Sequence, residues 1–399
     1  MSIRSVHGAV RLAFDSVEGI TNTVERMHQT IAGFPLPLSR RSYEPTQSHG
    51  MIAASVYSII RGVNGMMRDG VDITLGTLPQ TAGGTTAEIK TTAALNGAFG
   101  DHLEATGNPL ATSMSLMTSD EKLELDSDAL AAPLQQVSPH LVVLVHGLGL
   151  SELSWRRGEA PGLDNRLQAE TDCTILYLRY NSGRHVSTNG REFAQKLKRL
   201  CALWPVPVKS LSLIGHSMGG LIIRSACCYA EQNEEDWLEP LQRIAFLGTP
   251  HHGAPLEKAG HAIDVLLQRS PYTAPLALGR HRSAGIKDLR YGNLLDEDWE
   301  EDANLPQPDT RIAVPLSAGV DYYFVAASVG QHDRDPLGHL LGDLLVRRDS
   351  AIGAHEEAHK ELPIVADHCR VFHEKHHFDL LYDPQVHQQL LDWFGAKAA

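Results

Sequence analysis

The order of apolar runs between residues 141 and 248 constrains the fold more than any other feature of this chain. Short runs rich in Val, Ile and Leu alternate there with longer amphipathic segments. Strands that are so continuously apolar are buried on both faces, and connections of helix length join strands in parallel. We therefore expect an α/β fold in which a mostly parallel sheet lies between two layers of helices. The expected strands are 141–145, 173–180, 210–215 and 243–248, and the expected helices are 154–169, 191–204 and 218–232.

Later segments predict that the sheet continues and that a helix ends the chain. The runs "YYFVAASV" (322–329) and "CRVFH" (369–373) fit two more strands. The segment 383–394 fits a terminal helix, with Asp383 as its cap and Pro384 in its first turn. Ahead of the regular part, "SMSLM" (113–117) and "LELDS" (123–127) predict two short strands.

The N-terminal part has a different character. Residues 1–75 carry apolar positions at steps of three and four, which predicts two amphipathic helices, and residues 76–92 read as a linker. We therefore expect an N-terminal helical extension and linker over 1–91 and a catalytic domain over 92–399. The helical pair would pack on that domain or on a second copy of the chain, which makes a homo-oligomer an open alternative. Peripheral association with a membrane surface is the other reading.

Composition excludes several classes of partner. The formal net charge is −13 and no block of Lys and Arg occurs, which argues against nucleic acid and against anionic membranes. No signal peptide and no apolar run of spanning length is recognised, so a cytoplasmic protein without a transmembrane segment is the expectation. The five cysteines match no metal-binding spacing and fit free thiols. We expect no cofactor and no metal.

The pentapeptide Gly215–Gly219, "GHSMG", lies between an expected strand and an expected helix. This context distinguishes a nucleophile elbow from a chance match to G-x-S-x-G. A sharp turn holds Ser217 at the edge of the sheet, and side chains two positions away would collide across it, which explains the glycines. The sequence therefore predicts Ser217 as a nucleophile.

A serine hydroxyl needs a base and donors for the oxyanion. "VHGLG" ends the strand at 141–145, and its glycines allow the Leu148 N–H to turn toward the serine, with the Met218 N–H as second donor. The base should come last in the chain, and His377 in "HHFDLL" is chosen over His373 and His376.

Asp343, in the apolar surroundings of "LLGDLLV", is the expected acid that orients the imidazole of His377. The open rivals are Asp321, Asp333, Asp335 and Asp349.

Together these segments resemble the bacterial serine esterases and lipases of the α/β-hydrolase superfamily, in the branch of lipases and GPI inositol-deacylase-like hydrolases. The motifs "HGLG", "GHSMGG", "LGTPHHGAPLE", "GDLLVRRDSAIG" and "HFDLL" occur in the expected order. Leu344, Arg347 and His376 depart from the residues usual at those places. The resemblance implies hydrolysis of a small-molecule or lipid-like carboxylic ester through an acyl-enzyme. The resemblance does not separate a carboxylesterase from a lipase or from an enzyme that accepts polyesters. A thioesterase or an acyltransferase would use the same residues.

The segment 254–318 lies between strands and is rich in apolar residues. The resemblance implies that it forms an inserted cap over the serine, which suits an apolar substrate.

Two alternatives from other functional classes remain. His355-Glu356-Glu357-Ala358-His359 fits H-E-x-x-H, so that His355 and His359 on one helix face could hold zinc with Glu356 as base. The charged segment fits a solvated helix better. The second alternative is an interaction protein on the same fold without catalysis, which labelling of Ser217 would separate.

Overall fold

The structure of the chain is a computed structural model. It describes residues 5, 7, 8, 10–12, 15, 85–119, 121–125, 137–156, 161–254, 283–299, 311–332, 335, 342–343 and 345–395. The chain divides into two compact units, which are described separately. One consists of Met1–Glu88 with Leu103–Ala111, and the other of Ile89–His102 with Thr112–Ala399.

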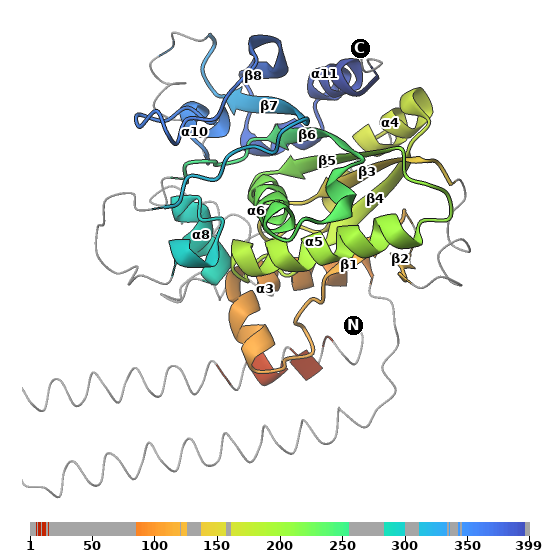
Figure 1. Cartoon of the computed structure of the whole chain (residues 1–399). Coiled ribbons are helices and arrows are strands. Elements are labelled where there is room, and N and C mark those ends of the chain that lie inside the picture. The colour runs from red at the N-terminus through yellow and green to blue at the C-terminus, as the bar shows by residue number, and fades with distance from the viewer. Residues whose placement is uncertain are drawn as a thin grey trace, which may run out of the picture. The chain divides into compact units, whose positions relative to one another are not determined.

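The larger unit is built on an eight-stranded sheet of order β2-β1-β4-β3-β5-β6-β7-β8 (Figure 1). Strands from β4 to β8 in that order pair in parallel, whereas β1 pairs antiparallel with both β4 and β2. Parallel strands end at one edge, so the loops that follow them gather there. The strands are β1 Ser115–Met117, β2 Lys122–Leu123, β3 His140–Val145, β4 Thr174–Arg179, β5 Ser210–His216, β6 Leu241–Leu247, β7 Asp321–Ser328 and β8 Cys369–His373.

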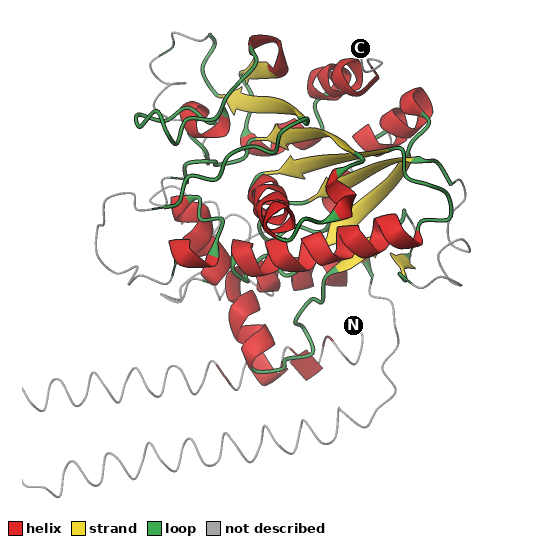
Figure 2. Cartoon of the chain, viewed as in Figure 1, coloured by secondary structure: helices red, strands yellow, loops and turns green. Residues whose placement is uncertain are grey.

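Helices cover both faces of the sheet (Figures 1 and 2). Helices α5 and α6 lie on one face, and α4 and α11 lie on the other. Helix α5 shows why: Phe193, Leu197 and Leu200 recur at helical spacing and are fully buried against the sheet. The helices are α3 Thr86–Ala105, α4 Leu163–Thr171, α5 Val186–Leu203, α6 Met218–Gln232, α8 Ala284–Tyr291, α10 Arg348–Ala351 and α11 Pro384–Gly395.

The core forms two apolar layers because successive side chains of a strand point to opposite faces. Leu141, Val143 and Val145 of β3 pack in the layer under α5 and α6. Val142 and Leu144 pack in the other layer, under α4 and α11. The prediction of an α/β fold with a mostly parallel sheet, buried on both faces, is confirmed.

Most expected elements occur close to their expected places. Helix α6 has the expected bounds, and α11 begins at Pro384 with the Asp383 carboxylate accepting a bond from the Gln385 N–H at 2.8 Å. The expected helix at 154–169 is instead a short 3-10 turn, η1 Glu152–Trp155, followed by α4.

One helix was not expected. Residues 76–92 read as a linker, yet α3 begins at Thr86, so that reading is wrong for its last part. The Thr85 hydroxyl accepts from the Glu88 N–H at 3.3 Å, and the Glu88 carboxylate accepts from the Thr85 N–H at 2.8 Å. This reciprocal pair is a capping box, and the T-x-x-E spelling in "TTAE" was the signal for it. Phe99 departs from helical geometry and kinks α3.

The smaller unit is described at few positions. The Arg11 guanidinium donates to the carbonyls of Gly107 and Thr106, and the Asn108 amide donates to the Gly8 carbonyl at 3.1 Å. The predicted helical pair over 1–75 lies almost wholly outside the described residues. The boundary between extension and catalytic domain near residue 92 and the homo-oligomer alternative stay predictions.

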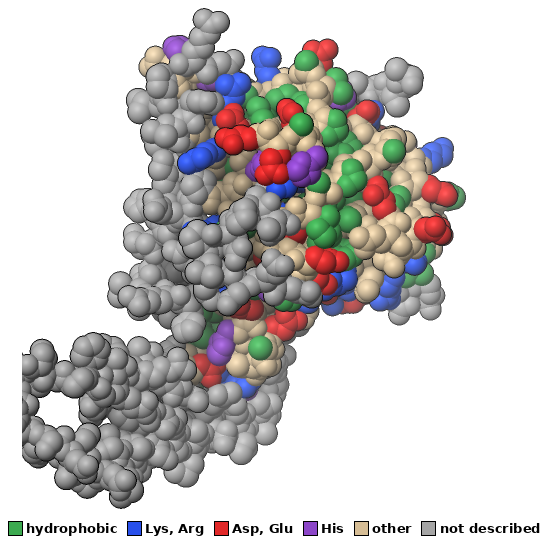
Figure 3. Space-filling model, turned by 60° about the vertical axis from the view of Figure 1, so that its left-hand side comes forward, with side chains coloured by type: hydrophobic (Ala, Val, Ile, Leu, Met, Phe, Trp, Pro, Cys, Tyr) green, Lys and Arg blue, Asp and Glu red, His purple; other side chains and the backbone are tan. Residues whose placement is uncertain are grey.

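Two properties of the described residues bear on which partners the chain could have. On the face in Figure 3, Lys and Arg side chains are scattered among acidic and apolar ones. No helix in the described part of the chain is both long and apolar enough to cross a membrane.

Candidate active site

The turn between β5 and α6 places Ser217 in a rare backbone conformation. Ser217 has φ 55° and ψ −124°, a region that serine adopts only when its surroundings enforce it. A Cβ atom at Gly215 would lie 2.6 Å from the Gly220 nitrogen, and one at Gly219 would lie 2.3 Å from the Val145 carbonyl oxygen. Both glycines are therefore needed for the turn, as the sequence predicted.

The loop after β3 lies directly against this serine. A Cβ atom at Gly147 would lie 3.1 Å from the Ser217 Cβ, a tighter contact than most real Cβ atoms make, so glycine favours the close approach of the two segments. Leu148 follows Gly147, and Met218 is the first residue of α6, where N–H groups lack partners within the helix. The two predicted oxyanion donors thus belong to segments that meet at Ser217.

His377 and Asp343 are brought together from positions 34 residues apart. The His377 Nδ1 lies 2.6 Å from the Asp343 Oδ2, and both side chains are at most 2% exposed. The other carboxylate oxygen of Asp343 accepts from the N–H groups of Leu345 at 2.9 Å and Val346 at 2.7 Å. These three contacts fix the position of the Asp343 carboxylate and thereby the plane of the His377 imidazole.

The second imidazole nitrogen of His377 is held in place but not bonded. His377 opens the 3-10 turn η6 His377–Leu381, and its N–H donates to the Asp343 carbonyl at 3.3 Å. Its Nε2 is buried and has no hydrogen-bond partner in the described structure. With Nδ1 donating to Asp343, Nε2 is the atom that could accept a proton.

Two neighbours fix the position of this ring. A Cβ atom at Gly248, which has φ 60° directly after β6, would lie 2.9 Å from the His377 Cε1. The His216 Nε2 lies 3.3 Å from the His377 carbonyl oxygen, and the two rings are 4.8 Å apart. His216, next to the serine, is thus tied to the segment that carries His377.

The rival residues that the structure describes do not form the pair seen between His377 and Asp343. The His376 N–H donates to the Asp379 carboxylate at 2.8 Å and so caps η6. Asp321 begins β7, at the edge of the sheet opposite to the site. Asp349 is exposed on α10, and the Asp335 carboxylate accepts from the Gln331 N–H at 3.0 Å. His373 ends β8, and Asp333 is outside the described residues.

The segment after β4 supports the loop after β3, which carries the predicted oxyanion donor Leu148, and this support was not predicted from the sequence. The Tyr180 hydroxyl donates to the His146 carbonyl at 2.7 Å, and the two rings stack at 4.2 Å. The Ser182 hydroxyl accepts from the Gly149 N–H at 2.9 Å. A polar "YNSG" segment at the carboxyl end of a strand, the active edge of such sheets, was the available signal.

Helix α3 packs on the same loop. A Cβ atom at Gly97 would lie 2.7 Å from the Gly149 Cα, and one at Gly100 would collide with the Asn181 side chain. The Ser283 hydroxyl donates to the Gly97 carbonyl at 2.6 Å and fastens the helix to the residue that precedes α8. The unexpected helix is therefore part of the support of the site.

Burial keeps His146 and His216 neutral. It lowers the pKa of His146 to about 4, against a smaller opposite influence of the Gly147 carbonyl, and it holds the pKa of His216 well below its ordinary value. Both rings are fully buried. A protonated imidazole at either place would lose its hydration, and at His146 the Glu152 carboxylate offsets only part of that loss.

We expect acid to destabilise the fold through these histidines. A histidine with a lowered folded pKa takes up its proton first in the unfolded chain, so the free energy of unfolding falls as pH drops from about 6.5 toward the folded pKa. For His146 the loss between pH 7.5 and pH 5 is about 2 kcal/mol. Urea unfolding at the two pH values measures it. A His146→Gln variant should lose about that much less than wild type; an equal loss in both proteins would contradict the assignment.

The H-E-x-x-H segment does not form the arrangement that zinc requires. Residues 354–360 form no helix: 354 and 355 have no regular structure and 356–360 are bends and turns, so four-residue spacing does not place His355 and His359 on one helix face. The His359 side chain is 65% exposed and lies 3.5 Å from the Glu357 carboxylate. The His355 Nδ1 accepts from the Glu357 N–H at 3.0 Å. The expectation of a regular solvated helix here is also wrong.

The expected cap is mostly outside the described residues. Its apolar positions Leu256, Ile263, Val265, Leu266, Leu267, Tyr272, Leu276 and Leu278 all fall in 255–282.

Comparison with known proteins gives one family match. Residues 135–288 match the family described as "Putative serine esterase (DUF676)". No curated protein matches the chain.

Several solved structures are similar to the chain. The mature lipase BlEst2 of Bacillus licheniformis is 18% identical over 66% of this chain and 96% of its own, with a TM-score of 0.41. Lipase B of Aspergillus fumigatus is 13% identical over 70% of this chain and 60% of its own, with a TM-score of 0.41. Phospholipase PlaB from Legionella pneumophila is 20% identical over 53% of this chain and 45% of its own, with a TM-score of 0.35.

The expected bacterial origin and the likeness to GPI inositol-deacylase-like hydrolases stay predictions. The sheet order, the strained elbow and the loops at its edge are those of an α/β-hydrolase. The chain is thus an α/β-hydrolase-fold protein whose residues 135–288 match a family of serine esterases.

Proposed function

We propose that the chain hydrolyses carboxylic esters through an acyl-enzyme formed on Ser217. The observation that carries this proposal is the buried His377–Asp343 pair at 2.6 Å, whose free Nε2 comes to the same sheet edge as the strained serine. A neutral imidazole with one fixed and one unbonded nitrogen is the arrangement of a general base.

The proposed reaction has two halves. His377 Nε2 takes the hydroxyl proton of Ser217 while the Ser217 Oγ attacks the ester carbonyl, and the Leu148 and Met218 N–H groups donate to the oxyanion. The imidazolium then gives its proton to the leaving alcohol, and the acyl group stays on Ser217. In the second half a water molecule loses its proton to His377, attacks the acyl carbon and releases the acid. Asp343 stabilises the imidazolium in both halves without taking a proton.

The strained serine argues against a chain that has lost catalysis. A backbone conformation of this kind costs on the order of 1–3 kcal/mol, and the surrounding glycines preserve it at Ser217. An interaction protein would gain nothing from that cost. Thioester cleavage and transfer of the acyl group to an alcohol would use the same atoms, so they remain the second candidates.

The substrate class is proposed from the sequence of the cap. The apolar residues of 254–318 suit a lipid-like ester, and polymeric esters belong to the same class of apolar substrates. A panel of alkyl esters, triglycerides, thioesters and polyesters, each with and without a competing alcohol, separates hydrolysis from transfer.

We expect a fluorophosphonate to label Ser217 in the intact protein. A nucleophilic serine with a base beside it attacks the phosphorus, its hydroxyl proton passes to the base and fluoride leaves the phosphorus, so that one phosphonyl group is added to the chain. Mass spectrometry of the intact chain and of its peptides should find one label, on Ser217, and ester hydrolysis should stop in proportion.

Two controls make this result specific. Heat-unfolded protein should take up no label, because the base is then no longer beside the serine. A zinc chelator should leave hydrolysis unchanged. Ester hydrolysis that persists after full labelling, or that a chelator abolishes, would contradict the serine mechanism.

A further inference from the structure

Three consecutive peptide groups of the loop after β3 are surrounded by separate contacts. The middle one joins Gly147 to Leu148, and its N–H is the predicted oxyanion donor. The described part of the chain contains no hydrogen bond from this N–H, whereas the carbonyl of the same peptide and both neighbouring peptides are bonded. The donor is therefore left open while the groups around it are fixed.

The carbonyl of the middle peptide accepts two hydrogen bonds. The Leu150 N–H donates to the Gly147 carbonyl at 3.2 Å, and the His146 Nδ1 donates to it at 2.9 Å. Burial lowers the pKa of His146 to about 4, so the ring is neutral at neutral pH and carries its proton on Nδ1, because a carbonyl can only accept. A trans peptide is planar, so the fixed carbonyl also sets the direction of the Leu148 N–H, which points the opposite way.

The Tyr180 side chain holds the first of the three peptides. Its hydroxyl donates to the His146 carbonyl at 2.7 Å, and its ring stacks on the His146 ring with the two planes 12° apart. Tyr180 is buried, and burial raises the pKa of its hydroxyl well above the ordinary value, so the proton stays available for this bond. One side chain thus fixes both the His146 carbonyl and the ring that binds the middle peptide.

The Ser182 hydroxyl holds the third peptide. It accepts from the Gly149 N–H at 2.9 Å, and its side chain is buried. The segment between the two hydroxyls is itself anchored, since the Asn181 amide donates to the Gly100 carbonyl at 2.8 Å and its side-chain oxygen accepts from the Gly183 N–H at 3.1 Å. Both hydroxyls therefore reach the loop after β3 from a segment that is fixed by its own hydrogen bonds.

We propose that Tyr180 and Ser182 are positioning residues, which hold the Leu148 N–H in the direction of the oxyanion. This inference rests on the proposed function, since an oxyanion forms only when Ser217 attacks a carbonyl. A donor that is already aimed stabilises the charge of the transition state more than the uncharged substrate, so a loosened loop lowers the rate of the chemical step and leaves substrate binding intact. Hydroxyls that only satisfied buried backbone groups would affect the stability of the fold alone.

Inhibition by an alkyl trifluoromethyl ketone separates these two roles. The Ser217 Oγ adds to the ketone carbon, the serine proton passes to His377, and the ketone oxygen becomes an oxyanion that needs the donors. We expect Tyr180→Phe and Ser182→Ala each to lower kcat for an activated ester by about 10- to 100-fold, with KM within about twofold of wild type. Inhibition by the trifluoromethyl ketone should weaken by the same factor as kcat, whereas inhibition by the less electrophilic methyl ketone of equal chain length should not change.

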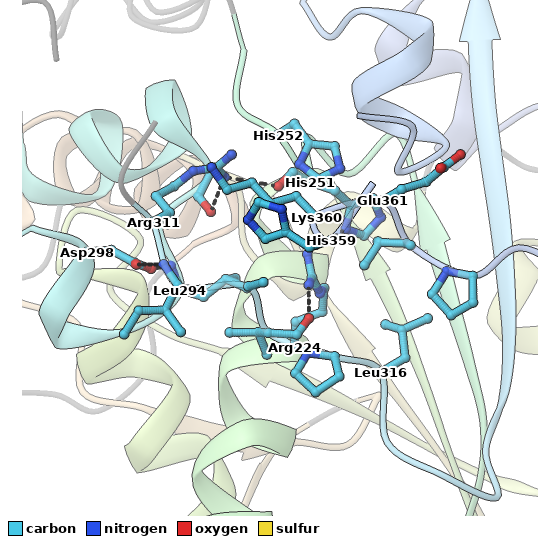
Figure 4. A pocket seen from close by; sticks show the side chains of 17 residues that line it. Arg224, His251, His252, Leu294, Asp298, Arg311, Leu316, His359, Lys360 and Glu361 are labelled. Atoms are coloured by element: carbon cyan, nitrogen blue, oxygen red, sulfur yellow. Dashed lines mark hydrogen bonds between the residues drawn. The ribbon is translucent and has the colours of Figure 1, made fainter. Parts of the chain in front are cut away.

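Two control variants should lower stability without moving the donor. Tyr177→Phe removes a buried hydroxyl from β4 itself, but Tyr177 lies in the other core layer, where its hydroxyl donates to the Asp164 carboxylate. Leu316→Ala removes apolar contacts at the wall of a cavity beside α6, and no residue of the loop after β3 lines that cavity (Figure 4). Both variants should melt at a lower temperature than wild type and keep kcat and ketone inhibition within about twofold.

The outcomes distinguish failure of this inference from failure of the proposed function. Fluorophosphonate labelling of wild-type Ser217 is measured in parallel. If the serine is labelled while folded Tyr180→Phe and Ser182→Ala proteins keep kcat and ketone inhibition as the controls do, the two hydroxyls only stabilise the fold, and the positioning role alone is overturned. If wild-type Ser217 takes up no label, the proposed function and this inference fail together.

Discussion

Replacement of Ser217 by alanine should lower the rate of ester hydrolysis by about 10⁵- to 10⁶-fold. The hydroxyl forms the bond to the acyl group, and nothing else at the elbow can replace it, because its neighbours in the turn are glycines, a methionine and a buried neutral histidine. The oxyanion donors and the bound geometry would sustain a small residual rate through direct attack of water. Steady-state hydrolysis of an activated ester measures the effect.

A serine on the same strand provides the matched control. Ser210 begins β5 at the opposite edge of the sheet, where its hydroxyl lies 2.7 Å from the His140 Nδ1. Ser210→Ala should therefore keep the rate within about twofold, since surface changes away from the site act weakly. Substantial activity in folded Ser217→Ala protein would show that another residue is the nucleophile, while the fold would remain as described.

The central part of the fold could be predicted because its signals are local. The strands β3 and β5 are short apolar runs, and α6 follows β5 without a break, so periodicity and length are enough to place them. The glycines of the elbow are likewise a local signal, since the collisions they avoid involve the residues of one turn and the strand beside it.

The sequence-based predictions for helix α3 and for the 354–360 segment were wrong for opposite reasons. The Thr, Ala and Gly residues of α3 give little amphipathic contrast, and two of its glycines serve close packing on Gly149 and Asn181, which is a tertiary cause. The 354–360 segment has helix-forming residues, yet local contacts of Glu357 with His355 and His359 accompany turns there instead. Composition was thus misleading in these two segments, where tertiary or side-chain contacts decided the conformation of the backbone.

The candidate acids could be ranked from the sequence, but the choice between Asp343 and Asp349 could not be decided from it. Asp343 and Asp349 both follow β7 and lie six positions apart, and sequence separation does not say which one turns inward. The decision depends on the turn at Gly342, which has φ 57° and whose added Cβ would lie 2.0 Å from the Val346 carbonyl oxygen. This tight turn directs the Asp343 carboxylate to two N–H groups and to His377, and leaves Asp349 exposed on α10.

Replacement of Asp343 by asparagine should lower kcat by about 10⁴-fold while the turn stays intact. The amide oxygen can still accept from the Leu345 and Val346 N–H groups, so the turn keeps both of these hydrogen bonds. The amide nitrogen, however, would then face the His377 Nδ1 and donate to it. The ring would carry its proton on Nε2 instead, and a protonated Nε2 cannot take the proton of Ser217.

Asp349→Asn is the control for this experiment, because it makes the same chemical change on an exposed carboxylate of the same loop region. We expect its kcat within about twofold of wild type. Melting temperatures of both variants separate loss of function from loss of fold, and fluorophosphonate labelling of Asp343→Asn should slow in parallel with kcat because both reactions need the same base. A reversed order, with Asp349→Asn inactive and Asp343→Asn active, would show that the carboxylate bonded to His377 is not the one that orients it during turnover.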